Sequence, residues 1–208
     1  MIAVINYGVG NLFSLTCSLQ DLGAEVVVTG DADTIRKADK IIFPGVGAFE
    51  DAIHKLRETG LDVVLKEEAA AGKPILGICL GMQLLFEKSY EFGEFEGLGL
   101  LPGAIVPLSG YIPDELKIPH MGWNSLCLTE NGRSSPLFRY VKDGDFVYFV
   151  HSYWAQCDES VVTSNTDYGT IVTASVARDN VMGVQFHPEK SGPVGLKMLK
   201  AFCEMEAR

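Results

Sequence analysis

Short apolar segments alternate with helix-like segments in the N-terminal part of the chain, and this alternation limits the fold more than any other feature. The apolar segments span residues 2–5, 24–28, 40–43 and 74–78. Helical periodicity predicts one helix that ends near residue 22 and others over residues 48–56, 61–71 and 80–88. Apolar strands connected through helices form parallel sheets covered on both faces. We therefore expect an α/β fold with a central, mostly parallel sheet flanked by helices.

The pattern changes in the C-terminal half. Residues 97–184 are rich in β-branched and aromatic residues and in Gly, Pro, Asn and Ser, without a long helical period. Such a stretch predicts additional, partly antiparallel strands, which we expect to join the same sheet. A final helix is expected over residues 193–206. Because no repeat, low-complexity tract or linker interrupts the sequence, residues 1–208 are predicted to form a single domain.

The composition narrows the possible partners. The 208 residues include 17 basic and 27 acidic side chains, for a formal net charge of −10. No basic cluster offsets this charge, so neither nucleic acid nor an anionic membrane is an expected partner. No signal-peptide pattern and no membrane-length apolar run is present, which predicts a soluble, cytoplasmic protein. Five cysteines lie far apart without a C-x-x-C pair, which argues against disulfides and against a metal site.

The segment Gly77-Ile78-Cys79-Leu80-Gly81 lies between an apolar strand and a helix. A nucleophile on a sharp strand-to-helix turn needs small neighbours, because the backbone there is strained and crowded. The positive end of the following helix would favour the thiolate, and the Leu80 amide would become free as an oxyanion donor. A buried cysteine between two packing glycines is the alternative. The strand-turn-helix context favours Cys79 as a nucleophile.

A thiol nucleophile needs a base, and His187 is the strongest of four candidates. It follows an apolar strand over residues 180–186, and Pro188 ends that strand. Residues two apart on an extended segment point the same way, so Glu189 can bond one ring nitrogen of His187 while the other faces the thiol. His54 lies in a predicted exposed helix, whereas His120 and His151 remain possible. The pattern predicts a triad of Cys79, His187 and Glu189.

These motifs resemble those of the class I, or triad, glutamine amidotransferases. Two segments carry this resemblance, residues 77–83 (GICLGMQ) and 187–189 (HPE). Within the class, the chain is most similar to the glutaminase subunits of imidazole glycerol phosphate synthases along its whole length. The segments that indicate this subfamily are residues 6–12, 44–49, 97–103, 119–124, 151–153 and 183–191. The resemblance implies the flavodoxin-like class I glutaminase fold.

The resemblance also implies a reaction. Cys79 would attack the side-chain amide of L-glutamine, His187 would protonate the departing ammonia, and water would release glutamate from the thioester. The ammonia would pass to a (β/α)8-barrel cyclase subunit, the partner in a heterodimer. That subunit would convert a phosphoribulosyl-formimino intermediate (PRFAR) to imidazole glycerol phosphate and an aminoimidazole carboxamide ribotide (AICAR) in histidine biosynthesis. No cofactor is expected.

Further residues fit this chemistry. Gly45 and Val46 are candidates for the second oxyanion donor, and Gly47 for a substrate contact, because glycines let a peptide turn toward a substrate. In the family this strand is thought to change orientation when the partner is activated. Gln83, one helical turn after Cys79, is expected to hold the amino-acid end of glutamine. Ser152 and Tyr153 are the other substrate-binding candidates. A plain turn at residues 45–47 and an exposed helix glutamine at position 83 are the alternatives.

Four residues are expected at the partner interface. Trp123, between Gly122 and Asn124, is a candidate anchor because aromatic residues dominate interface energies, although a core tryptophan is the alternative. Asn6, Asn11 and Lys190 occupy positions that look like signalling and gating positions of the family. Phe13 is a departure, since the family commonly has arginine there, which puts in doubt a polar contact from this position.

Three other functions remain open from the sequence. The chain could itself be another class I glutaminase, one that supplies ammonia to a different synthase. It could be a cysteine hydrolase that acts without a partner, which would be fully active alone. It could also be a non-catalytic subunit with a vestigial site, although the intact triad argues against this.

Overall fold

The computed structural model describes residues 1–8 and 11–206. Val9 and Gly10 of the opening loop segment lie outside the described residues. The helices are α1 (Leu12–Asp21), α2 (Ala32–Lys37), α3 (Phe49–Glu58), α4 (Leu61–Ala70), α5 (Leu80–Leu84), α6 (Glu130–Ser134) and α7 (Gly192–Cys203), with 3-10 turns η1 (Pro136–Phe138), η2 (Glu159–Val161) and η3 (Pro188–Lys190). The strands are β1 (Ile2–Ile5), β2 (Val26–Thr29), β3 (Lys40–Gly45), β4 (Ile75–Cys79), β5 (Phe86–Ser89), β6 (Phe95–Glu96), β7 (Leu101–Pro107), β8 (His120–Ser125), β9 (Cys127–Leu128), β10 (Phe146–His151), β11 (Tyr153–Gln156), β12 (Val162–Asp167), β13 (Ile171–Arg178) and β14 (Val181–Val184).

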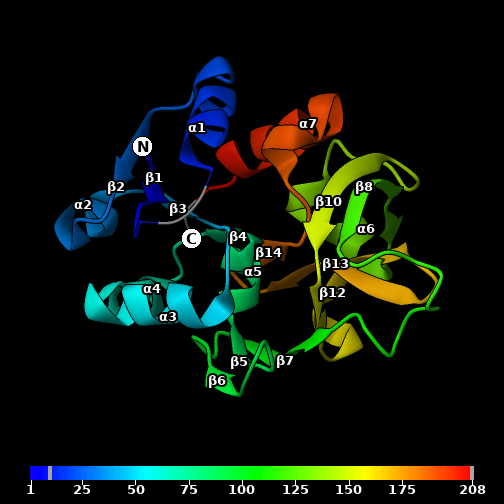
Figure 1. Cartoon of the computed structure of the whole chain (residues 1–208). Helices are drawn as coiled ribbons and strands as arrows, with labels where there is room; N and C mark the ends of the chain where they lie inside the picture. Colours follow the sequence, from blue (N-terminus) through cyan, green and yellow to red (C-terminus); the bar gives the residue numbers. More distant parts are fainter. Residues whose placement is uncertain (9–10, 207–208) are drawn as a thin grey trace.

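An eight-stranded sheet forms the centre of the molecule, in the order β2-β1-β3-β4-β14-β13-β12-β9. The first five strands of this order pair in parallel, and β13, β12 and β9 continue the sheet antiparallel. The predicted mixed sheet, mostly parallel with antiparallel strands from the C-terminal half, is therefore confirmed. Helices α1 and α7 lie on one side of the parallel strands, and α3 and α4 lie on the other (Figure 1).

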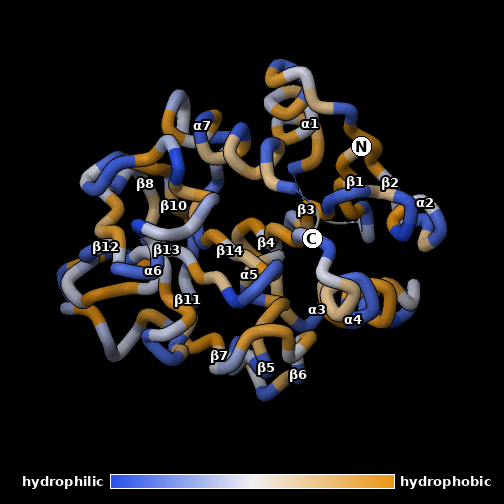
Figure 2. Tube along the Cα trace, turned by 180° about the vertical axis from the view of Figure 1, so that it is seen from behind, coloured by the Kyte–Doolittle hydropathy of each residue, from blue (hydrophilic) through white to orange (hydrophobic). Residues whose placement is uncertain are grey.

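Alternation along the parallel strands divides the core into two layers. In β1, Ala3 and Ile5 pack into one hydrophobic cluster, with the buried faces of α3 and α4. Ile2 and Val4 point to the opposite face and pack with α1 and α7. Successive strand residues point to opposite faces, and both faces are covered, so the strands read as continuous apolar runs. Figure 2 shows these hydrophobic segments along the central strands β4 and β14.

The expectation that all later strands join the main sheet is wrong in part. Strands β11, β7, β5 and β6 form a separate four-stranded sheet, and β10 pairs with β8 in a two-stranded sheet. The helix expected over residues 80–88 is also shorter than predicted, because α5 ends at Leu84 and the chain continues as β5. There Phe86 pairs with Leu101 of β7 and becomes fully buried. This long-range strand pairing overrides the local helical pattern.

The remaining predicted elements agree with the structure to within a few residues. Two short helices, α2 and α6, were not predicted from the sequence. Asp31 caps α2 by accepting a hydrogen bond from the Thr34 amide at 2.9 Å. Asp31 is therefore an N-cap signal that identifies the helix in retrospect. Within the described part of the chain, no helix combines the length and apolar character needed to cross a membrane.

Candidate active site

Cys79 ends β4 and starts α5 in a strained backbone conformation, with φ 55° and ψ −113°. Positive φ is uncommon for residues other than glycine and persists only where the surrounding structure imposes it. A Cβ atom at Gly81 would collide with the Phe43 carbonyl oxygen, and one at Gly77 would lie 2.8 Å from the Gly81 carbonyl oxygen. Glycine is therefore required on both sides of Cys79. The side chain of Cys79 is almost buried at the carboxyl edge of the sheet.

His187 reaches the same edge because β14 lies beside β4. The two strands are parallel, with Gly183 opposite Gly77 and Val184 opposite Ile78. Beyond β14 the chain turns at Pro188, and the His187 Nδ1 atom lies 2.8 Å from Glu189 Oε1. Both side chains are 3% exposed. A carboxylate on Nδ1 leaves Nε2 as the nitrogen that exchanges protons with the site.

The charge of His187 depends on its two neighbours. Burial disfavours the imidazolium, but the Cys79 sulfur and the Glu189 carboxylate outweigh it and raise the pKa of His187 to about 9. Among the described residues, His187 Nε2 makes no hydrogen bond within normal distance and angle limits. Catalytic hydrogen bonds are often long before substrate binds. The arrangement favours the imidazolium form of His187 beside the Cys79 sulfur.

A cavity of about 440 Å³ opens above these residues, and we call it the triad cavity. This volume suits a small-molecule ligand. Its lining brings together most of the predicted site residues with several that the sequence did not indicate: Val46, Gly47, Cys79, Leu80, Gln83, Glu91, Phe92, Pro119, Val150, His151, Ser152, Tyr153 and His187.

Two of the three predicted oxyanion donors, Val46 and Leu80, line the triad cavity, and so does Gly47, which was predicted as a substrate contact. The third, Gly45, does not line the cavity. It pairs with Cys79 in the sheet and packs against the strand-to-helix turn at Cys79, which we call the elbow. A Cβ atom at Gly45 would lie 2.6 Å from the Tyr7 hydroxyl oxygen. Gly47 has φ 103°, a conformation that favours glycine. The Val46 and Gly47 amides donate to no acceptor among the described residues, so they remain available as donors.

Three of the predicted substrate residues line the triad cavity together: Gln83, Ser152 and Tyr153. Gln83 is 5% exposed, so it is not the surface glutamine of the alternative interpretation. Its Nε2 atom donates to the Tyr153 carbonyl at 3.1 Å and to Gln185 Oε1 at 3.0 Å. The Gln83 Oε1 atom has no partner among the described residues and remains available to a ligand. Ser152 and Tyr153 follow β10 and are half-buried.

Two site residues escaped the sequence analysis. Glu91 is the acidic side chain in the lining of the triad cavity; its carboxylate accepts a hydrogen bond from the Phe49 amide at 2.8 Å, and burial raises its pKa. It lies in a glutamate-rich stretch that looks like a solvated surface, so no local signal distinguishes it. Gln185 is fully buried next to Cys79, and its Nε2 atom lies 3.8 Å from the sulfur.

The predicted interface residues are exposed or half-buried. Trp123 is 55% exposed on β8, which excludes a core role, and its ring meets Tyr148 edge-on. Asn6 follows β1 and Lys190 follows β14, so both lie at the edge that carries Cys79, and both are exposed. Asn11 precedes α1 without capping it through its side chain. Phe13 is 81% exposed; no structural feature explains its presence at a position where arginine is common.

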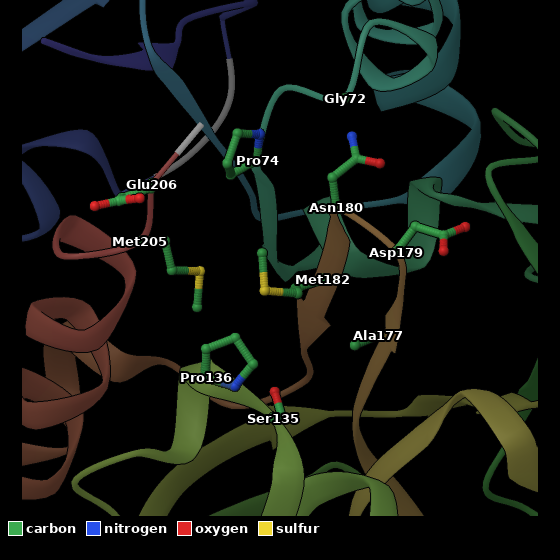
Figure 3. A pocket seen from close by; sticks show the side chains of 10 residues that line it. All are labelled: Gly72, Pro74, Ser135, Pro136, Ala177, Asp179, Asn180, Met182, Met205 and Glu206. Carbon is green, nitrogen blue, oxygen red and sulfur yellow. The ribbon is translucent and has the colours of Figure 1, made fainter. Parts of the chain in front are cut away.

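A second cavity, of about 520 Å³, lies at the opposite edge of the sheet (Figure 3). Pro74 and Asn180, just before β4 and β14, line it with Met182 and Met205. The Asn180 amide nitrogen is already bonded to the Ala69 and Lys73 carbonyls. This cavity holds none of the predicted site residues. Within the described ranges no group of three His, Cys, Asp or Glu side chains is arranged to bind a metal.

Comparisons with known proteins agree with this geometry. The family model "Glutamine amidotransferase class-I" matches residues 3–205. The chain is 50% identical over 206 residues to "Imidazole glycerol phosphate synthase subunit HisH" of Oceanobacillus iheyensis, covering 99% of each chain. It is 51% identical over 204 residues to the protein of the same description in Lactococcus lactis, covering 98% of each.

Solved structures show the same fold at lower identity. PurLQS from Thermotoga maritima superposes with a TM-score of 0.74 at 22% identity, covering 97% of this chain and 96% of that one. A structure described as a glutamine amidotransferase gives a TM-score of 0.74 at 17% identity, covering 97% of this chain and 99% of the other. With a family model over nearly its whole length and relatives that are half identical, the chain belongs to the class I glutamine amidotransferases, within the family of the imidazole glycerol phosphate synthase HisH subunits.

Proposed function

We propose that the chain is the glutaminase subunit of an imidazole glycerol phosphate synthase. It hydrolyses L-glutamine and delivers the ammonia to a (β/α)8-barrel cyclase subunit, which uses it to form imidazole glycerol phosphate and AICAR from PRFAR. One observation carries the catalytic part of this proposal. A strained Cys79 and a carboxylate-paired His187 meet at one edge of the sheet, beneath a cavity of suitable size.

The first half-reaction forms a thioester. The Cys79 thiolate attacks the side-chain carbonyl carbon of glutamine, and the carbonyl oxygen becomes an oxyanion. The Leu80 amide and an amide of Val46 or Gly47 supply hydrogen bonds to it. The His187 imidazolium gives its Nε2 proton to the amide nitrogen, the carbon–nitrogen bond breaks, and ammonia leaves.

The second half-reaction returns the free enzyme. His187, now neutral, takes a proton from water, and the resulting hydroxide adds to the thioester carbonyl. The carbon–sulfur bond breaks, glutamate leaves, and the sulfur is again a thiolate beside an imidazolium. Glu189 keeps the His187 ring oriented throughout and stabilises its positive charge.

The cavity wall suits the amino-acid end of glutamine. The Glu91 carboxylate can pair with the α-ammonium group, and Gln83 Oε1 can accept a further hydrogen bond from it. Ser152 and Tyr153, which also line the cavity, are the proposed contacts of the α-carboxylate. These contacts fix the substrate so that its side-chain amide meets Cys79, which converts binding energy into orientation.

The partner is proposed to dock at the edge that carries the triad. Trp123, Lys190, Asn6 and Asn11 provide its contacts, with Trp123 as the aromatic anchor. Val46 and Gly47 follow β3 at this edge and line the triad cavity, so a partner that docks here can change the direction of their amides. An incomplete oxyanion hole would leave the isolated chain a weak glutaminase.

The test measures glutamate release by the isolated chain, by the chain with its barrel subunit, and by that complex with PRFAR. The expected order is very weak, weak and strong. Full activity of the isolated chain would overturn the proposed dependence on a partner. Cys79→Ala should remove activity in all three states without lowering the unfolding midpoint. Retained glutaminase activity in that variant would overturn the mechanism.

A further inference from the structure

Gln185 is a fully buried polar residue that the mechanism above does not use. It follows β14, two residues before His187, and its backbone N–H donates to the Ala174 carbonyl at 2.8 Å. A buried amide side chain is costly unless both of its ends form hydrogen bonds. Its carbonyl oxygen accepts from Gln83 Nε2 at 3.0 Å, and its nitrogen lies 3.8 Å from the Cys79 sulfur. The side chain therefore presents a donor to the nucleophile.

The orientation of this amide is fixed by the groups behind it. Gln83 Nε2 carries two hydrogens, and they reach the Tyr153 carbonyl and Gln185 Oε1. Because a carbonyl can only accept, Gln83 must present its nitrogen to both oxygens. Gln185 must then present its oxygen to Gln83 and its nitrogen to Cys79. A flipped Gln185 amide would place two nitrogens against each other and an oxygen against a thiolate.

The Tyr153 carbonyl also accepts a hydrogen bond from His151, which is in turn bonded to His120. His151 Nδ1 lies 2.9 Å from this carbonyl and must donate to it. His151 Nε2 must therefore accept, and it lies 3.0 Å from His120 Nδ1. His120 Nε2 is in turn an acceptor 3.4 Å from the Asn124 amide nitrogen. The direction of each hydrogen bond in this series is therefore fixed, from Asn124 on β8 to the Cys79 sulfur.

We infer that Gln185 is a further catalytic residue, whose amide donates a hydrogen bond to the Cys79 thiolate and is oriented for this by Gln83. The inference rests on the proposed function, since it assigns a role at the same nucleophile. A hydrogen bond donated to a charged acceptor is stronger than one between neutral groups, and it favours the charged form of the acceptor. The other titratable groups around the sulfur are His187, which is paired with Glu189, and Tyr7, and His151 and Glu91 line the same cavity. All of these residues are kept in the position 185 variants.

The test measures the pH dependence of iodoacetamide alkylation at Cys79, by mass spectrometry of the peptide that contains it, in the complex with the barrel subunit. Gln185→Met removes the donor at similar volume and should raise the midpoint of the alkylation profile by about one pH unit. This corresponds to roughly a tenfold loss of thiolate below the midpoint. Gln185→Glu keeps the shape and the acceptor for Gln83 but opposes a thiolate, and should raise the midpoint further. Gln20→Met, an exposed change on α1, is the matched control and should leave it unchanged.

Gln83→Met tests the orientation step. It should raise the midpoint in the same direction by less, and adding it to Gln185→Met should have no further effect on the midpoint. A midpoint within 0.2 unit of the wild type in folded Gln185→Met or Gln185→Glu would overturn the inference. If Gln185→Met does not fold, as judged by thermal unfolding, Gln185→Glu decides alone.

The two proposals fail in different ways. If the wild-type complex hydrolyses glutamine and Cys79→Ala does not, the proposed function stands whatever the Gln185 variants show. If wild-type Cys79 is alkylated no faster than the exposed Cys127 at neutral pH, the proposed nucleophile is wrong. In that case the alkylation midpoints still decide whether Gln185 acts on the sulfur.

Discussion

Two buried histidines line the same cavity and are prepared for opposite charge states. His187 bonds the Glu189 carboxylate, and its pKa rises to about 9 because the carboxylate and the Cys79 sulfur outweigh burial. His151 is as well buried but bonds only a carbonyl and a second histidine, and burial lowers its pKa to about 3. The pKa of His120 falls to about 4 for the same reason. The charge of each partner, and not the depth of burial, decides the charge of a buried histidine.

Hydrogen-bond satisfaction differs between these two regions as well. Among the described residues, two of the four buried side-chain atoms without a partner belong to the triad, His187 Nε2 and Glu189 Oε2. The paired histidines, His120 and His151, use every ring nitrogen. Unsatisfied polar atoms are costly, so they persist where a substrate or transition state will engage them. A saturated network behind the site gives it a rigid support.

The largest effect should come from removing the charge on the triad side. Glu189→Gln keeps the shape but loses the negative charge, so the pKa of His187 should fall from about 9. Replacing the orienting carboxylate of a triad by its amide costs on the order of 10⁴ in kcat in a serine protease. Glutaminase assays of the complex and histidine NMR titration measure the two effects. Activity within tenfold of the wild type would show that the carboxylate is dispensable.

Acid should destabilise the paired-histidine side. His120 and His151 have folded pKa values of about 4 and 3, below the ordinary 6.5, so the unfolded state binds more protons between these limits. The free energy of unfolding is therefore highest above pH 6.5 and decreases as the pH falls toward 3–4. At pH 4, His120 alone should lower it by about 3 kcal/mol. Urea unfolding across pH 4–7 measures this loss. His120→Gln, which keeps a donor toward His151, should have a shallower dependence; an unchanged dependence would contradict the assignment.

A carboxylate introduced beside the paired histidines should reduce the difference in histidine pKa between the two regions. Asn124→Asp places a negative charge near His120 Nε2, where the amide nitrogen now lies at 3.4 Å. The pKa of His120 should rise from about 4 by about 1–2 units. Asn124→Leu removes the same hydrogen bond without adding charge and is the control. Equal His120 titrations by NMR in the two variants would show that charge is not the deciding factor.

The smallest effect should come from the Tyr7 hydroxyl. It is buried beside the elbow without a partner among the described residues, and burial and the nearby Cys79 both raise its pKa. Because Tyr7→Phe removes an unsatisfied polar atom, the free energy of unfolding should stay the same or rise by up to about 1 kcal/mol. Thermal or urea unfolding measures this. A loss of more than 1 kcal/mol would reveal a hydrogen bond to this hydroxyl.

Local patterns in the sequence predicted most of the parallel half. Strand β1 over Ile2–Ile5 was predicted to the residue, and β3, α3 and α4 within two or three residues. The strands are covered on both faces and are therefore continuously apolar, whereas the two helices bury one face and carry apolar residues at helical spacing. The C-terminal half was predicted less well. The division into three sheets depends on pairings such as β11 with β7, in which Tyr153 lies opposite Pro107, far away in the chain, and no local signal indicates the pairing.

The candidate site also combines features that local sequence patterns predict with features that depend on the tertiary structure. The sequence by itself determined the elbow at Cys79 and the His187–Glu189 pair, because tight turns need glycine and proline and because residues two apart on a strand point the same way. Only the tertiary structure brought β14 beside β4, placed Glu91 in the cavity and joined Gln185 to Cys79. A buried glutamine and a surface-like glutamate look ordinary in a sequence. Their roles depend on which groups the fold places within hydrogen-bonding distance, and this is set by strand register over a hundred residues of chain.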